Sequence, residues 1–171
     1  MPYRPQDGFF RKAKREGYRS RAAYKLLEIN RRFRLVEPGD AVVDLGAAPG
    51  GWLQVAAEVA GPNGRVYGFD LQPVEPLSKQ NVRVYELDLL AENAAQRISD
   101  LLGGTAACVL SDMAPRLSGI RDADRGRSLE LAQKAYEIAR EILKPRGAFL
   151  FKTFTGTEVK ALVEEISNCF E

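Results

Sequence analysis

Residues 44–52 read Asp-Leu-Gly-Ala-Ala-Pro-Gly-Gly-Trp, and this stretch decides the fold. An apolar run over residues 41–45, typical of a buried strand, leads into it, and residues 52–60 continue as a helical pattern. Glycines in a strand-to-helix turn let the backbone approach a ligand closely. Neither the G-x-G-x-x-G dinucleotide fingerprint nor the Gly-Lys-Ser/Thr of a P-loop is present. The turn therefore predicts a nucleoside-like ligand that need not carry a pyrophosphate.

Strand and helix patterns alternate along the rest of the chain. The predicted strands cover residues 41–45, 65–71, 82–87, 106–110 and 148–154. The predicted helices cover residues 52–60, 91–102 and 127–143, with another after Ser20 and a last one from residue 159. This alternation predicts an α/β fold, a parallel sheet with helices on both faces, and we expect the strand order 3-2-1-4-5. Ligands of such sheets bind beyond the carboxyl ends of the strands.

The composition excludes several classes of protein. Cys108 and Cys169 belong to no spaced cluster, so neither a disulfide framework nor a zinc site is expected. Histidine, the usual general base and the commonest metal ligand, is absent from the sequence, and no metal site is predicted. With no signal-peptide pattern and no apolar run near the ~20 residues that span a membrane, we expect a soluble, cytoplasmic protein.

The net charge of +2 is unevenly distributed. Residues 1–34 contain eleven Lys and Arg against three acidic residues, whereas the remaining chain contains fourteen against twenty. A basic head on an acidic body indicates a polyanionic partner, although a solvated basic tail would have the same composition. Since residues 1–19 are polar and interrupted by Pro and Gly, we predict a mobile basic arm there and a single domain over residues 20–171.

Acidic residues lie at the ends of the second and third predicted strands. Asp70 can accept hydrogen bonds from both hydroxyls of a ribose, as acidic residues do at this position in nucleotide-binding sheets. Asp88 lies among leucines and suits an adenine amino group. Each also has a structural alternative, a turn for Asp70 and a helix N-cap for Asp88.

Polar residues also mark the ends of the fourth and fifth strands. Residues 111–115 read Ser-Asp-Met-Ala-Pro, and Lys152 lies within the apolar fifth strand. A lysine in such a strand is costly unless it is paired or used, although a position at the strand end would let it reach solvent. In the order 3-2-1-4-5 these two strands are neighbours, so we expect Asp112 and Lys152 to meet.

Together these residues resemble the FtsJ-like family of RNA ribose 2′-O-methyltransferases. The matching stretches are residues 20–26 (Ser-Arg-Ala-Ala-Tyr-Lys-Leu), 43–52, 111–115 and Lys152 in its strand. The resemblance runs from about residue 18 to the end of the chain. It implies a Rossmann-like class I methyltransferase that transfers a methyl group from S-adenosylmethionine to a ribose 2′-hydroxyl of RNA. The most similar branch methylates a uridine of ribosomal RNA, within the large ribosomal subunit.

The resemblance also implies the site residues. The family uses a Lys-Asp-Lys-Glu tetrad, and Lys25, Asp112 and Lys152 match its first three members. The residues expected to contact the cofactor are Gly46, Ala47, Pro49, Gly50, Gly51, Trp52, Asp70, Leu71, Asp88, Leu89 and Asp112.

The glutamate of the tetrad has no match. In the family it lies in a closing strand pair near the C-terminus, whereas this chain stops at Glu171, and Glu164 and Glu165 do not fit the motif. We therefore expect a C-terminally short domain, or a tetrad that is completed differently. Without the closing strands the fifth strand becomes a sheet edge, so we expect a monomer that can associate through this edge.

In the absence of histidine, lysine is the remaining strong base for a ribose hydroxyl. Our hypothesis is that Lys152 accepts the proton, that Asp112 orients it, and that Lys25 favours its neutral form and steers the ribose. The alternative for Lys25 is a surface lysine paired with Glu28.

The basic arm is expected to bind RNA phosphates. The candidate residues are Arg4, Arg11, Lys12, Lys14, Arg15, Arg19 and Arg21. Two other readings remain open, a methyltransferase of transfer RNA or another structured RNA, and a non-catalytic module that binds the cofactor and RNA. A nicotinamide dehydrogenase is a weaker alternative because its glycine spacing differs.

Overall fold

The computed structural model describes residues 8–170 and contains six helices and five strands in that range. The helices are α1 (Gly8–Arg15), α2 (Ala22–Phe33), α3 (Gly51–Ala60), α4 (Ala94–Leu102), α5 (Arg121–Ile142) and α6 (Thr157–Cys169). The strands are β1 (Ala41–Leu45), β2 (Arg65–Asp70), β3 (Val82–Glu86), β4 (Ala106–Ser111) and β5 (Leu143–Phe151).

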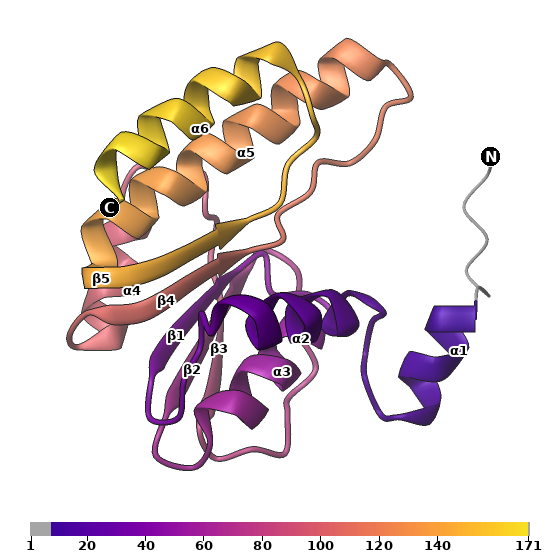
Figure 1. Cartoon of the computed structure of the whole chain (residues 1–171), viewed down its shortest axis with the longest axis vertical. Coiled ribbons are helices and arrows are strands. Elements are labelled where there is room, and N and C mark those ends of the chain that lie inside the picture. Colours follow the sequence, from indigo (N-terminus) through magenta and orange to yellow (C-terminus); the bar gives the residue numbers. More distant parts are fainter. Residues whose placement is uncertain (1–7, 171) are drawn as a thin grey trace.

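The five strands form one parallel sheet in the order β3-β2-β1-β4-β5, which confirms the predicted fold. Helices α2 and α3 cover one face of the sheet, and α4 and α5 cover the other, with α6 packed beside α5 (Figure 1). Side chains alternate between the faces, so Val42 packs with the α3 cluster and Val43 with the α4–α5 cluster. Because helices cover both faces of the sheet, side chains on both faces are buried, and the strands read as continuous apolar runs.

The N-terminal segment differs from its prediction. Residues 8–15 form α1, a helix that the sequence did not predict, and Ala13 of this helix is buried. Ser20 does not cap α2, whose N-cap is Arg21, because a turn precedes the helix and directs the Ser20 hydroxyl toward Gly51 of α3. Phe33, placed on the apolar stripe of α2, is 59% exposed.

The bounds of α5 and β5 also differ from their predictions. Helix α5 begins six residues before the predicted start at residue 127, in a polar first turn whose Asp122 and Asp124 favour a helix N-terminus. Strand β5 begins at Leu143, five residues before the predicted start at residue 148. A bulge between Ala106 and Cys108 in the pairing of β4 with β5 accommodates these additional residues. β5 also ends at Phe151, so Lys152 lies just beyond the strand, at the edge of the sheet.

Gly68 of β2 sets how closely α3 approaches the sheet. A Cβ atom at this position would lie 2.9 Å from both terminal methyl carbons of Leu53 and 3.1 Å from the Cβ of Ala47. Leu53 is fully buried, so it has little room to move away.

We therefore expect Gly68→Ala to lower the free energy of unfolding by about 1–3 kcal/mol through overpacking. Leu53→Ala alone should cost about 2–5 kcal/mol, but in that background the added methyl has space and the Gly68→Ala penalty should shrink. Urea unfolding of the four proteins measures this coupling. Gly104→Ala is the control, since a Cβ there meets nothing within 4 Å. Equal Gly68→Ala penalties in both backgrounds would contradict this packing.

Candidate functional site at the carboxyl edge of the sheet

A cleft of about 940 Å³ lies at the carboxyl ends of the strands. The predicted cofactor residues that line it are Gly46, Pro49, Asp70, Leu71, Asp88, Leu89 and Asp112. Ala47, Gly50, Gly51 and Trp52 are buried outside its lining, and the Trp52 indole donates a hydrogen bond to the carbonyl of Ala22. The lining also includes Met113 from the Ser-Asp-Met-Ala-Pro stretch, and Arg116 and Arg127, which the sequence motifs did not indicate.

The glycine turn is shaped by close backbone contacts. Gly46 has a φ of 79°, and a Cβ there would lie 2.8 Å from the Cγ of Met113. The amide of the next-but-one residue, Ala48, donates to the carboxylate of Asp70 at 2.9 Å. A side chain at position 46 would therefore be strained and would fill the space between the turn and the end of β4.

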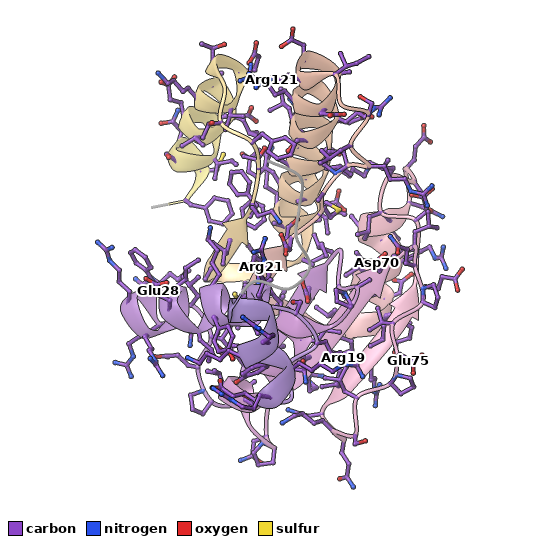
Figure 2. All side chains as sticks on the ribbon, turned by 90° about the vertical axis from the view of Figure 1, so that its right-hand side faces the viewer. Arg19, Arg21, Glu28, Asp70, Glu75 and Arg121 are labelled. Atoms are coloured by element: carbon purple, nitrogen blue, oxygen red, sulfur yellow. The ribbon has the colours of Figure 1, made fainter. Side chains whose placement is uncertain are left out.

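Arg19 joins three segments around this turn. Its guanidinium donates hydrogen bonds to the carbonyls of Pro49 at 3.3 Å, Pro76 at 2.8 Å and Glu75, and Figure 2 shows Arg19 and Glu75 side by side. Its backbone amide donates to the side chain of Gln54 at 2.8 Å. Phosphate binding by Arg19 stays a prediction, and it would compete with these bonds.

Two of the predicted carboxylates bind the backbone near them. Asp70 accepts hydrogen bonds from the amides of Ala48 and Gln72, and Asp88 accepts one from the amide of Leu90 at 3.0 Å. The turn role considered for Asp70 is thus present. Both carboxylates face the cleft and keep acceptor capacity for a ligand.

Asp44 is the least expected residue of the site. It is 1% exposed, and among the described residues neither of its carboxylate oxygens has a hydrogen-bond partner. Burial, together with the nearby charges of Asp112 and Asp70, raises the pKa of Asp44 well above its ordinary value. The sequence analysis placed Asp44 at the start of the turn. It could not predict that the carboxylate lacks hydrogen bonds, because this depends on the side chains packed around it.

Asp112 and Lys152 meet as expected from the strand order. They form an ion pair and hydrogen bond, with the side chains 22% and 46% exposed. The register Ser111↔Phe151 and the bond from the Lys152 amide to the Ser111 carbonyl bring the two residues together. Lys152 therefore combines both of the roles considered for it, because it reaches solvent at a strand end and is also paired.

Ser128 of α5 holds the segment that follows Lys152. Its hydroxyl lies 3.2 Å from that of Thr153 and accepts a hydrogen bond from the amide of Phe154 at 3.2 Å. Ser128 is 4% exposed. Sequence reasoning missed it, because a serine in a helix gives no sign of the strand end against which it packs.

The basic residues of the N-terminal segment lie mostly on the surface. Arg11, Lys12, Lys14 and Arg15 on α1 are exposed, and Lys12 lies 4.9 Å from the ring centroid of Tyr24. Lys25 is exposed in the first turn of α2, and within residues 8–170 it forms neither the considered pair with Glu28 nor a bond to the Asp112–Lys152 pair. Arg21 is engaged in an interaction within the chain, and Arg4 lies outside the described residues.

Neither a metal-binding cluster nor a membrane-spanning helix is found in the part of the chain that the structure describes. Residues 8–170 contain no cluster of three or more His, Cys, Asp or Glu that could hold a metal ion. None of the helices in that range is long and apolar enough to cross a membrane.

The chain is similar to known methyltransferases over most of its length. Residues 18–171 match the model of the FtsJ-like methyltransferase family. A protein of Anaeromyxobacter dehalogenans named ribosomal RNA large subunit methyltransferase E is 47% identical over 99% of this chain and 63% of its own length. Its namesake from Methanothrix thermoacetophila is 47% identical over 96% of this chain and 63% of its own length. That from Myxococcus xanthus is 44% identical over 99% of this chain and 80% of its own length.

Two solved structures share the fold. A Plasmodium falciparum protein assigned as a ribosomal RNA methyltransferase has a TM-score of 0.79 at 24% identity, over 88% of this chain and 86% of that one. The MycE methyltransferase of the mycinamycin pathway, solved with Mg and SAH, has a TM-score of 0.60 at 16% identity, over 95% of this chain and 39% of that one.

The burial of Asp44 predicts a pH dependence of stability. Because its pKa is raised in the folded chain, its contribution is fully present at acidic pH, below its ordinary pKa, and is lost as the pH rises toward the folded pKa. An asparagine at this position would stay neutral at every pH, so the stability of Asp44→Asn relative to the parent should increase steadily with pH. Asp122→Asn, at a side chain 95% exposed, is the control. A pH-independent difference for Asp44→Asn in urea unfolding would contradict this account.

The bonds of Arg19 predict a change in backbone protection. Arg19→Ala should increase hydrogen exchange in residues 46–50 and 72–77, because both segments lose a shared donor. Arg19→Lys should restore little of this, since an ammonium lacks the planar fork of donors. Arg11→Ala, at an exposed position on α1, should leave both segments unchanged. Unaltered exchange in Arg19→Ala would mean that the turn holds its shape without it.

Proposed function

Because the chain belongs to the FtsJ-like methyltransferase family, we propose that it transfers a methyl group from S-adenosylmethionine to a ribose 2′-hydroxyl of RNA. We further propose a uridine of large-subunit ribosomal RNA as its target. The ion pair of Lys152 with Asp112, at the edge of a nucleoside-sized cleft, carries the proposal. The names of the curated relatives support ribosomal RNA, although the chain spans 63% of the length of the first two.

The cleft suits S-adenosylmethionine, whose sulfonium and ammonium groups are positively charged. Asp44, Asp70 and Asp112 make this edge of the sheet acidic, and the two oxygens of Asp44 accept no hydrogen bond from residues 8–170. A cation nearby would relieve the repulsion among these carboxylates. Gly46 lines the cleft, and its missing side chain lets Met113 pack against the turn.

The adenosine part of the cofactor would lie beside the two carboxylates that line the cleft after β2 and β3. Asp70 would accept from the ribose hydroxyls and Asp88 from the adenine amino group, beside Leu71 and Leu89. The glycine spacing of the turn does not suit a dinucleotide pyrophosphate. These features favour S-adenosylmethionine over a nicotinamide cofactor.

The bound cofactor supplies a methyl group on a positively charged sulfur. The task of the protein is to align the 2′-oxygen with it and to remove the hydroxyl proton. Lys152 lies where it could accept that proton at Nζ, and Asp112 holds the ammonium in place through the ion pair. Positive charge near Lys152 favours its neutral form, so Lys25 and the sulfonium would act together on it, against Asp112.

The Asp112–Lys152 pair also favours an enzyme over a non-catalytic module. A module that only binds the cofactor would not need a lysine held at the open end of the cleft. The exposed cations of α1, with Lys25, would bind RNA phosphates on the α2 side of the site. A ribosomal RNA substrate supports a cytoplasmic location for the protein. Transfer RNA or another structured RNA is an alternative substrate.

Two assays in sequence test the proposal. Titration with S-adenosylmethionine should give saturable binding, and radiolabelled methyl should then pass to large ribosomal subunits or to naked ribosomal RNA. Comparing the two substrates tells whether the ribosomal particle is needed. Binding without transfer to any RNA would favour the non-catalytic module instead, and binding of NADH but not of S-adenosylmethionine would revive the dehydrogenase.

Replacing the proposed base should separate chemistry from binding. Lys152→Ala should lower the rate of methyl transfer by about 10²-fold or more, the usual contribution of a general base. Its affinity for S-adenosylmethionine should change little. Lys160→Ala, at an exposed lysine of α6, is the control and should keep the parental rate. A Lys152→Ala variant with full methylation would overturn the assignment.

A further inference from the structure

Three large apolar side chains are exposed where the β4–α5 loop meets the end of β5. Leu117 is 70% exposed, Ile120 is 66% exposed and Phe154 is 39% exposed. Leu117 and Phe154 line the same hollow, beside the N-terminal turn of α5. Exposed apolar side chains grouped in this way mark binding surfaces.

The β4–α5 loop, which carries Leu117 and Ile120, is held in a defined shape. The carboxylate of Asp124 is 7% exposed and accepts hydrogen bonds from the amide and the hydroxyl of Ser118, both at 2.8 Å, and from the amide of Gly119 at 3.2 Å. These bonds lower the pKa of Asp124. The carboxylate thus fixes the turn from which Leu117 and Ile120 project, so their exposure belongs to an ordered structure.

Four arginines surround the apolar group. Arg116 and Arg127 line the candidate cofactor cleft, and Arg121 and Arg125 line the hollow with Leu117. Of the nearby acids, Asp124 is occupied by the loop, Asp122 pairs with Arg125 at 3.7 Å in an exposed contact, and Glu158 lies in one hollow with Arg125 and Phe154. Within residues 8–170, Arg116 and Arg121 form no ion pair, so these two arginines remain available to an anionic ligand.

This surface borders the carboxyl edge of the sheet from the side opposite the N-terminal cations. Helix α5 covers one face of the sheet and α2 the other. In Figure 2, Arg121 lies at the start of α5, at the top, far from Arg19 and Glu75 below. A strand of RNA that placed a ribose at Lys152 would thus meet basic residues on both sides.

We propose that Arg116, Leu117, Ile120, Arg121, Arg125 and Phe154 form a second RNA-binding surface, which we call the arginine tip. It binds an unpaired RNA segment next to the target nucleotide. This inference rests on the proposed function.

The chemistry of the arginine tip fits unpaired RNA. A nucleotide whose ribose enters the cleft leaves its neighbours without a stacking partner, and apolar side chains can cover the bases so exposed. The arginines neutralise the phosphates of the same segment and can also lie against base planes. A duplex would offer the phosphates but keep its bases stacked, so it would leave Leu117 and Ile120 uncovered.

Two double variants separate these contributions, with a fluorescent single-stranded oligoribonucleotide of mixed sequence as the probe. Arg121→Gln with Arg125→Gln should weaken binding and reduce the slope of log affinity against log salt by about 1 for each phosphate that the variant no longer neutralises. Leu117→Ser with Ile120→Ser should weaken binding by about tenfold without changing that slope. The Leu117/Ile120 variant should lose less affinity for duplex RNA than for the single strand, because a duplex keeps its bases stacked.

Matched controls carry the same substitutions elsewhere. Arg83→Gln with Arg97→Gln, and Leu101→Ser with Val163→Ser, change exposed residues of β3, α4 and α6 and should bind like the parent. Parental affinity and salt slope in both arginine-tip variants would overturn the inference. So would a loss seen with intact ribosomal subunits but not with naked RNA, which would assign the surface to a ribosomal protein. Affinity for S-adenosylmethionine, measured separately, distinguishes this failure from a failure of the proposed function.

Discussion

Burial of carboxylates at the carboxyl edge of the sheet is the constraint on which the site depends. The parallel register places Asp44, Asp70 and Asp112 at the ends of three adjacent strands. Their surroundings differ, since Lys152 pairs with Asp112, backbone amides bind Asp70, and Asp44 accepts no hydrogen bond from residues 8–170. A neutral ligand would leave the repulsion among them unchanged, whereas a cationic one would relieve it. This difference supports the proposal of a sulfonium cofactor.

The N-terminal segment is bonded to the same site. Arg19 ties it to the glycine turn and to the loop after β2, and Trp52 of α3 donates to the carbonyl of Ala22. The exposed cations of α1 are therefore attached to the backbone that would hold the cofactor, rather than to an independent tail. The arginine tip is anchored on the other side by Asp124. RNA would thus meet two ordered surfaces, one on each side of the sheet.

Features with a local sequence signal could be predicted, and those that depend on tertiary packing could not. Apolar runs alternating with helical patterns predicted the strands of a parallel sheet, and the order 3-2-1-4-5 expected for it predicted that Asp112 and Lys152 meet. No local pattern indicates that a buried Asp44 lacks a partner or that the guanidinium of Arg19 binds three carbonyls. The cap at Ser20 failed for the same reason, because its hydroxyl packs against a residue 31 positions later.

The chemical position of the transferred methyl group tests the central claim most directly. Alkaline cleavage of RNA requires a free 2′-hydroxyl, so a ribose methylated at that oxygen protects the bond that follows it. Ribosomal RNA labelled by this chain with radioactive methyl should therefore yield its label in alkali-resistant dinucleotides. Label recovered in mononucleotides would place the methyl group on a base, and would contradict the account of Lys152 as the group that receives the proton of a ribose hydroxyl.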